Sequence, residues 1–162
     1  MIRRLRDDTI SPAPPSPVAV LPAPRADRPG AGCTWALAGE SPQAGDVHRL
    51  RREARAVLSG RWGVPADLVD AAELVVCELV GNALRHGAAP VELCLRHGAD
   101  ETVTVTVCDA GGGLPRLRPV DENDESGRGL HLVNALTRWW TVWQHPDGGK
   151  TVTAVLALTA DH

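Results

Sequence analysis

The sequence predicts an α+β fold: a two-layer α/β sandwich with a mixed, mostly antiparallel sheet that about three helices cover on one face. Three observations predict it. Apolar residues recur at helical spacing in two neighbouring segments, residues 43–58 and 66–86. Two pairs of segments with alternating apolar and polar residues are each joined by a short turn, and a third helical segment separates these pairs. This order of elements is typical of helices packed on one side of a sheet.

The N-terminal segment has a composition unlike the rest of the chain. Residues 1–32 hold seven of the thirteen prolines and show neither a helical nor a strand period. We therefore expect a disordered Pro/Arg-rich tail over 1–32 and one folded domain over 33–160. Residues 11–17 are rich enough in proline to act as a polyproline ligand, but a linker has the same composition.

The first strand and first helix come next. Residues 33–38 read as a short strand, after which Ser41 offers a helix cap and Pro42 suits a first helical turn. The following residues form one amphipathic stripe: Val47, Leu50, Ala54, Val57 and Leu58. The arginines lie mostly off the stripe, as a solvated face or a surface for a partner: Arg49, Arg51, Arg52 and Arg55. Residues 60–65 then break the helix.

The remaining elements follow from periodicity. Residues 66–86 carry too many apolar side chains for a narrow stripe, which predicts a central and largely buried helix. Alternation predicts a hairpin from strands 91–96 and 102–108, and a second hairpin from strands 140–144 and 150–158. Between them, a Gly/Pro-rich acidic stretch precedes a short helix over 127–137.

Composition excludes several classes of protein. The 162 residues suffice for one core, and a net charge of -3 gives no field that would attract nucleic acid or anionic lipid. No apolar run approaches the roughly 20 residues that span a bilayer, and the N-terminus lacks the apolar stretch of a signal peptide. The four cysteines contain no CxxC pair, so no zinc or disulfide framework is indicated. We expect a cytoplasmic protein without a nucleic-acid or membrane partner.

The first candidate site lies near the end of the central helix, where Glu78 and Asn82 stand one turn apart. Residues four apart share a helix face, so the carboxylate and the amide project together. Magnesium bound to a nucleotide takes few protein oxygens, so Asn82 alone could be its protein ligand. Glu78 could accept a proton from a group that attacks the terminal phosphate. A solvent-facing polar stripe would use the same residues, and this motif alone does not decide between the two.

The second candidate site is the segment 109–113, which begins where a strand ends. The carboxylate of Asp109 could accept a hydrogen bond from the exocyclic amine of adenine. Gly111 and Gly113 lack a Cβ, so the backbone could lie close to a ring and turn sharply. An ordinary tight turn uses the same residues, so this motif by itself is weak.

The third candidate site is the segment 126–130, which opens the short helix. Helix N-termini present free N–H groups and partial positive charge, and Gly127 and Gly129 would let phosphate oxygens reach the backbone. A flexible helix cap explains the glycines equally well. The order and spacing of the three motifs make the combined case strong.

Together the motifs resemble the Bergerat ATP-binding fold of gyrase, heat-shock chaperones, histidine kinases and mismatch-repair proteins. The resemblance is nearest to the small bacterial anti-sigma-factor serine/threonine kinases, through residues 72–87 and 127–130, and it covers about residues 33–158. It implies ATP and Mg²⁺ as ligands, Glu78 as catalytic base and Asn82 as magnesium ligand. The other nucleotide-binding residues that it implies are Asp109, Gly111, Gly113, Gly127, Arg128, Gly129, Leu130 and Thr151.

The resemblance also implies partners. The implied function is transfer of the ATP γ-phosphate to a serine or threonine of a small antagonist, the anti-anti-sigma protein, together with sequestration of a sigma factor and a homodimeric state. Residues 114–126 would form a lid over ATP. Related kinases often have a basic residue before the Ser-Gly-X-Gly, where this chain has Glu125. That departure keeps open an alternative, an ATP-dependent partner-binding module with little or no catalysis.

Overall fold

The computed structural model describes residues 32–37, 44–115 and 128–157. In chain order the elements are β1 (Gly32–Leu37), α1 (Ala44–Arg55), the π-helical turn η1 (Ala56–Arg61), α2 (Ala66–His86), β2 (Val91–His97), β3 (Thr102–Asp109), α3 (Arg128–Leu136), β4 (Trp139–Gln144) and β5 (Lys150–Ala157). The predicted tail lies outside the described residues except Gly32, which is the first residue of β1 rather than part of the tail.

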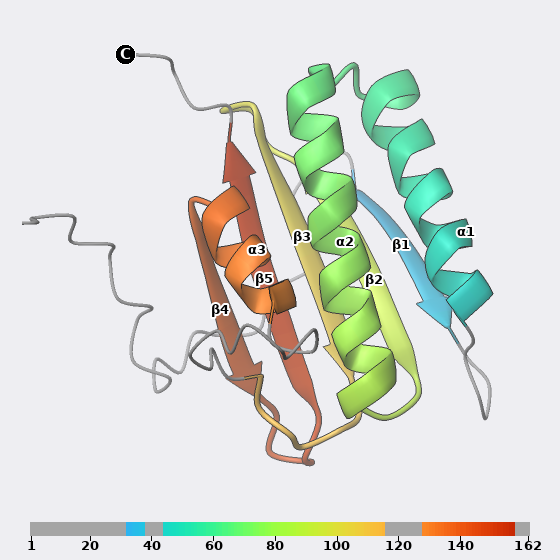
Figure 1. The fold of residues 1–162 in the computed structure, drawn as a ribbon, viewed down its shortest axis with the longest axis vertical. Helices are drawn as coiled ribbons and strands as arrows, with labels where there is room; N and C mark the ends of the chain where they lie inside the picture. The colour runs from blue at the N-terminus through green and yellow to red at the C-terminus, as the bar shows by residue number, and fades with distance from the viewer. Residues whose placement is uncertain (1–31, 38–43, 116–127, 158–162) are drawn as a thin grey trace, which may run out of the picture.

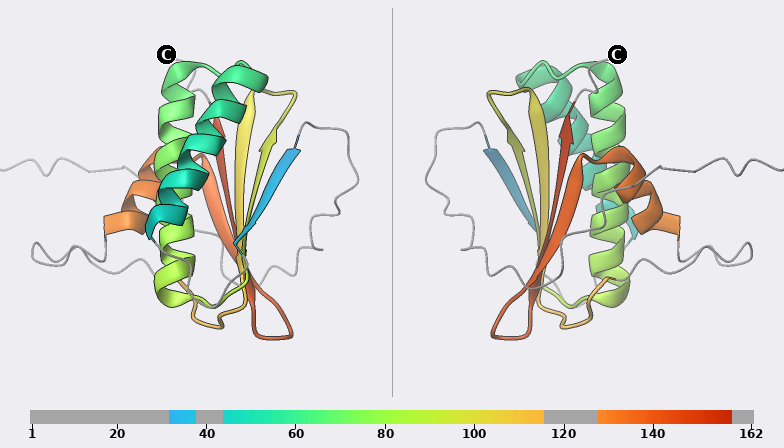
Figure 2. Two further views of the ribbon diagram at one scale, coloured as in Figure 1. Left: turned by 90° about the vertical axis from the view of Figure 1, so that its right-hand side faces the viewer. Right: turned by 90° about the vertical axis from the view of Figure 1, so that its left-hand side faces the viewer.

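The five strands form one sheet in the order β1-β2-β3-β5-β4, and the three α-helices cover one of its faces (Figure 1). Seen from the side, the helices and the sheet make two layers, and no described element covers the opposite face of the sheet (Figure 2). The predicted two-layer α+β sandwich is confirmed. The prediction of a mixed sheet is wrong for the described strands, because all four of their pairings are antiparallel.

The core lies between the helices and the sheet because strand residues alternate between the two faces. In β3 the inward residues are Val103, Val105, Val107 and Asp109, and their partners in β5 point the same way. α2 supplies the largest share of the helical layer, with ten buried residues among its 21. A buried Val or Leu side chain contributes about 1.5–3 kcal/mol, so α2 and the central strands hold the fold together.

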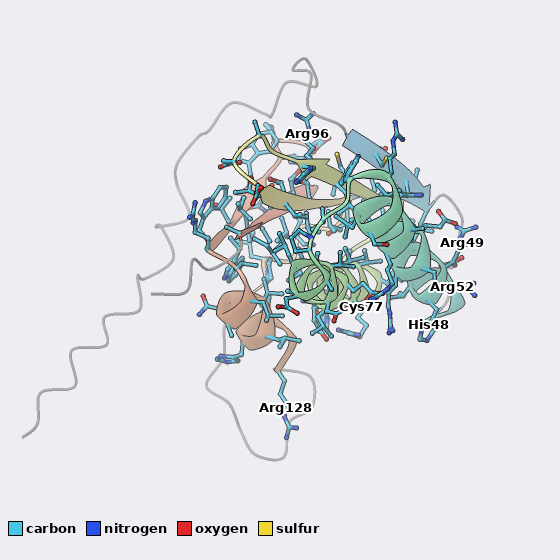
Figure 3. The ribbon with its side chains drawn as sticks, turned by 90° about the horizontal axis from the view of Figure 1, so that it is seen from above. His48, Arg49, Arg52, Cys77, Arg96 and Arg128 are labelled. Atoms are coloured by element: carbon cyan, nitrogen blue, oxygen red, sulfur yellow. The ribbon has the colours of Figure 1, made fainter. Side chains whose placement is uncertain are left out.

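The arginines of α1 divide into two groups. Arg51 and Arg55 reach Glu73 of α2, whose side chain is 10% exposed, so this charge network ties the two helices together. The hydrogen bonds that Arg55 donates to the carboxylates of Asp70 and then Glu73 raise the pKa of Arg55. Arg49 and Arg52 instead point outward from α1 (Figure 3). The helix also continues as a π-turn through Gly60, so the chain breaks slightly later than residues 60–65 had indicated.

Candidate functional site

The carboxylate of Glu78 lies against the first turn of α3. A Cβ built on Gly129, the second residue of α3, would stand 2.1 Å from Glu78 Oε2 and 3.0 Å from its Cδ. Only a glycine leaves room for the carboxylate in that position. The structure thus brings the first and third sequence motifs together through a side chain on α2 and a backbone position on α3.

The second polar group on this face of α2 is Asn82, which is hydrogen-bonded to a residue of the same helix. Arg85, one turn along, donates from Nη2 to Asn82 Oδ1 at 3.0 Å. The amide oxygen that would bind magnesium therefore already accepts a hydrogen bond from a guanidinium. A metal ion there would have to replace that hydrogen bond. In the described part of the chain, no group of three or more His, Cys, Asp and Glu side chains could hold a metal. A single amide oxygen could serve only a metal that takes most of its other ligands from water and phosphate, as magnesium does.

Asp109 ends β3 on the face covered by the helices and is 5% exposed. Its Oδ1 accepts from the Gly111 N–H at 2.8 Å and from Lys150 Nζ, also at 2.8 Å. Lys150 stands directly opposite Asp109 in β5, and its ammonium donates as well to the Gly111 carbonyl at 3.0 Å. A carboxylate, an ammonium and the start of the glycine segment thus form one buried cluster.

Close backbone contacts lock this cluster to the end of α2. A Cβ on Gly111 would lie 2.6 Å from Gly87 Cα, and a Cβ on Gly87 would lie 2.4 Å from Asp109 Oδ1. The N–H of Ala110 also donates to the Ala88 carbonyl at 2.9 Å. Both glycines are required because the two backbones meet here without space for a side chain.

Gly113 is less constrained than Gly111. A Cβ at Gly113 would make an ordinary contact, 3.5 Å from the carbonyl oxygen of His86 at the end of α2. Gly113 is exposed, as is Leu114 after it. The structure therefore brings Gly111 next to Asp109 but leaves Gly113 at the rim of the cluster.

The structure does not bring Thr151 together with Asp109. Thr151 pairs with Cys108, so both point to the sheet face away from the helices. Its hydroxyl contacts Cys108 Sγ at 3.2 Å and His145 Nε2 at 2.7 Å. Lys150 was not among the predicted site residues, although a signal existed: Val152, Ala154 and Leu156 are inward in β5, and position 150 has the same parity.

The start of α3 holds the remaining candidates. Arg128 is the first described residue of the helix, and its side chain extends away from the sheet (Figure 3). Leu130 is buried and anchors this end of α3 in the core. Gly127, Glu125 and the predicted lid beyond Pro115 lie outside the described residues.

Comparisons with known proteins agree with the fold. The family model described as histidine kinase-like ATPase domain matches residues 41–156, more than half of the chain. None of the curated proteins matches the chain. Among the described residues no helix is long and apolar enough to cross a membrane.

Two solved structures are similar to the chain. The crystal structure of the RsbU and RsbW domains of Rv1364c from Mycobacterium tuberculosis is 19% identical with a TM-score of 0.56, over 77% of this chain and 32% of that one. The histidine kinase domain from Erythrobacter litoralis EL346 blue-light activated histidine kinase is 23% identical with a TM-score of 0.46, over 75% of this chain and 65% of that one. The chain thus spans less than two thirds of either structure. The similarity to the Mycobacterium tuberculosis structure shows the fold alone.

Proposed function

The chain belongs to the histidine kinase-like ATPase domain family, and from this premise we propose that it is a protein serine/threonine kinase of the anti-sigma-factor type. In this proposal Mg-ATP lies along α2, with the base at Asp109 and the phosphates at the start of α3. The γ-phosphate passes to a serine or threonine of a small antagonist protein, and the unmodified complex sequesters a sigma factor in the cytoplasm. A homodimer of the chain belongs to the same proposal.

The observation that carries the proposal is the contact between Glu78 and Gly129. A helix N-terminus attracts phosphate oxygens through its free N–H groups. A carboxylate beside that terminus is therefore within reach of a group that attacks a bound phosphate. Without the contact, Glu78 would be one more polar residue on a helix face.

In this proposal each side chain has one role. Glu78 takes the proton of the attacking serine hydroxyl while the oxygen bonds to the γ-phosphorus and the bond to the β-phosphate oxygen breaks, which releases ADP. The backbone at Gly129 would hold phosphate oxygens, and Asn82 would hold the metal. Magnesium, when bound, neutralises phosphate charge. Asp109 accepts a hydrogen bond from the amine of adenine.

The alternative function is a binding module in which ATP controls a partner surface without useful catalysis. The hydrogen bond from Arg85 to Asn82 favours it, because a metal ion must displace a guanidinium before it can bind the amide oxygen. Glu125 in the sequence points the same way. In this alternative Glu78 only shapes the site.

Two measurements test the proposal. Calorimetric titration with ATP, with and without magnesium, should give binding to the wild type and none to Asp109→Ala; equal affinities would overturn the site. ADP formation and serine phosphorylation of candidate antagonists should be lost in Glu78→Gln while ATP affinity is retained. If partner control depends on ATP but survives in Glu78→Gln, the binding module is the correct function.

A further inference from the structure

Lys150 is the only lysine of the chain and lies in its interior. It is 4% exposed, and its ammonium contacts Asp109 Oδ1 and the Gly111 carbonyl. Burial of a charge is costly unless it is paired, and Asp109 provides the pair. Such a pair contributes little net stability compared with apolar residues of the same size, so its presence calls for a second explanation.

The geometry of the pair leaves groups for a ligand. Both donors to Asp109 in the described structure, Gly111 N–H and Lys150 Nζ, use Oδ1. A carboxylate has two acceptor oxygens, so Oδ2 is the one that can accept from a bound molecule. An ammonium has three donors, and the contacts to Asp109 and Gly111 take two of them. The pair therefore has an acceptor and a donor side by side, in side chains that are 1% (Asp109) and 5% (Lys150) exposed before a ligand binds.

We infer that Lys150 is a specificity-determining residue of the base site, which donates its third N–H to the ring nitrogen next to the amine that Asp109 accepts. This inference rests on the proposed function. Adenine carries the required pattern, since its amine is a donor and the neighbouring N1 is an acceptor. In guanine and hypoxanthine the corresponding positions are an acceptor oxygen and a donor N–H, so the order is reversed and the base is rejected.

A merely structural role for Lys150 makes a different prediction. In that case its charge only holds β3, β5 and the Gly111 backbone together, and it touches no ligand atom. Removal of Lys150 would then weaken the binding of every nucleotide by the same factor. If the inferred contact exists, removal of Lys150 weakens the binding only of nucleotides that carry an acceptor at N1.

The test compares ADP with 1-deaza-ADP, in which N1 is replaced by C–H, by calorimetric titration into wild type and Lys150→Met. A hydrogen bond to a charged group predicts that the wild type binds 1-deaza-ADP about 10- to 100-fold more weakly than ADP. In Lys150→Met the two ligands should bind within about twofold of each other. The diphosphate of purine riboside lacks the amine. It should bind both proteins more weakly than ADP does, because it has no donor for Asp109.

Gln144 provides the matched control. It is the β4 neighbour of Lys150 and donates to the carbonyl of Gly112, so it touches the same glycine segment without entering the buried pair. Gln144→Ala should keep the full preference for ADP over 1-deaza-ADP. A loss of preference in this variant would overturn the assignment to Lys150.

The remaining outcomes also decide the matter. If Lys150→Met does not fold, Asp109→Asn combined with Lys150→Met removes both charges together. Unlike Asp109→Ala, this variant keeps an amide oxygen at position 109 that accepts from the amine, so it should also bind the two ligands equally. An equal preference for ADP in wild type and in either folded variant overturns the inference while the proposed function stands. If ADP does not bind the wild type at all, the proposed function itself fails.

Discussion

Substitution of Gly129 by alanine tests the contact on which the proposed chemistry depends. An alanine Cβ would stand 2.1 Å from Glu78 Oε2, whereas ordinary contact begins at 3.4 Å, so the oxygen must retreat by about 1.3 Å. The obstructing atoms are the far end of a flexible side chain, so Glu78 can swing aside without repacking of the core. The substitution therefore moves the carboxylate and leaves the fold in place.

The expected magnitudes follow from that displacement. Misplacement of a catalytic group by about 1 Å can cost a factor of about 100 in rate, so ADP formation by Gly129→Ala should fall about 100-fold. The free energy of unfolding should change by less than about 1 kcal/mol, because alanine favours a helix by up to that amount and offsets the lost contact. The two effects separate catalysis from stability.

The assay is chromatographic measurement of ADP formed from Mg-ATP, together with urea unfolding. Gly45→Ala is the matched control, because Gly45 is also the second residue of its helix and a Cβ there meets nothing within 4 Å. Addition of Gly129→Ala to Glu78→Gln should cause little further loss, since both changes act through one carboxylate. A wild-type rate in Gly129→Ala, or a further 100-fold loss in the double variant, about 2.7 kcal/mol, would refute the reasoning.

Three further predictions concern stability. Asp109→Ala leaves the ammonium of Lys150 buried without its carboxylate partner and should lower the free energy of unfolding by about 3–5 kcal/mol. Asp109→Asn with Lys150→Met should lower it less, and urea unfolding compares the two variants. Glu73→Gln removes the charge between α1 and α2 and should cost about 1–3 kcal/mol, with a smaller difference at high salt. Burial raises the pKa of Cys108 above its ordinary 9.0, so the unfolded thiol ionises first and stability should fall as pH rises past that value; unfolding of wild type and Cys108→Ala on both sides of it checks the sign.

The elements that the sequence predicts well are those with strong periodicity and clear ends. α2 spans residues 66–86 as expected, because its apolar run is bounded by Pro65 and by Gly87, whose N–H closes on the Ala83 carbonyl. The strands of both hairpins agree with prediction to within about one residue at ends that the structure describes. Alternation sets which residues face the helices, and that face carries the core.

What the sequence did not predict depends on pairing. Strand direction and order come from contacts between distant segments, so local patterns could not tell a mixed sheet from an antiparallel one. The assignment of Thr151 rested on its place in a sequence motif. The register of β3 and β5 instead places Lys150 opposite Asp109 and turns Thr151 to the other face. A shift of one residue exchanges the faces, which is why a motif read without register misplaces a side chain.

The spacing of contacts along α2 suits the proposed nucleotide site. Glu78 meets α3 at Gly129, and nine residues later Gly87 meets the end of β3 at Gly111. At 1.5 Å per residue, these two contacts are about 13 Å apart along the helix axis. A ligand that reaches both must be extended, and in the proposed site its base lies at the buried carboxylate and its charged oxygens at the helix terminus. Asn82 lies between the two contacts, where the proposed function would place a metal bound to the phosphates. In that proposal one helix sets the distance between recognition of the base and phosphoryl transfer.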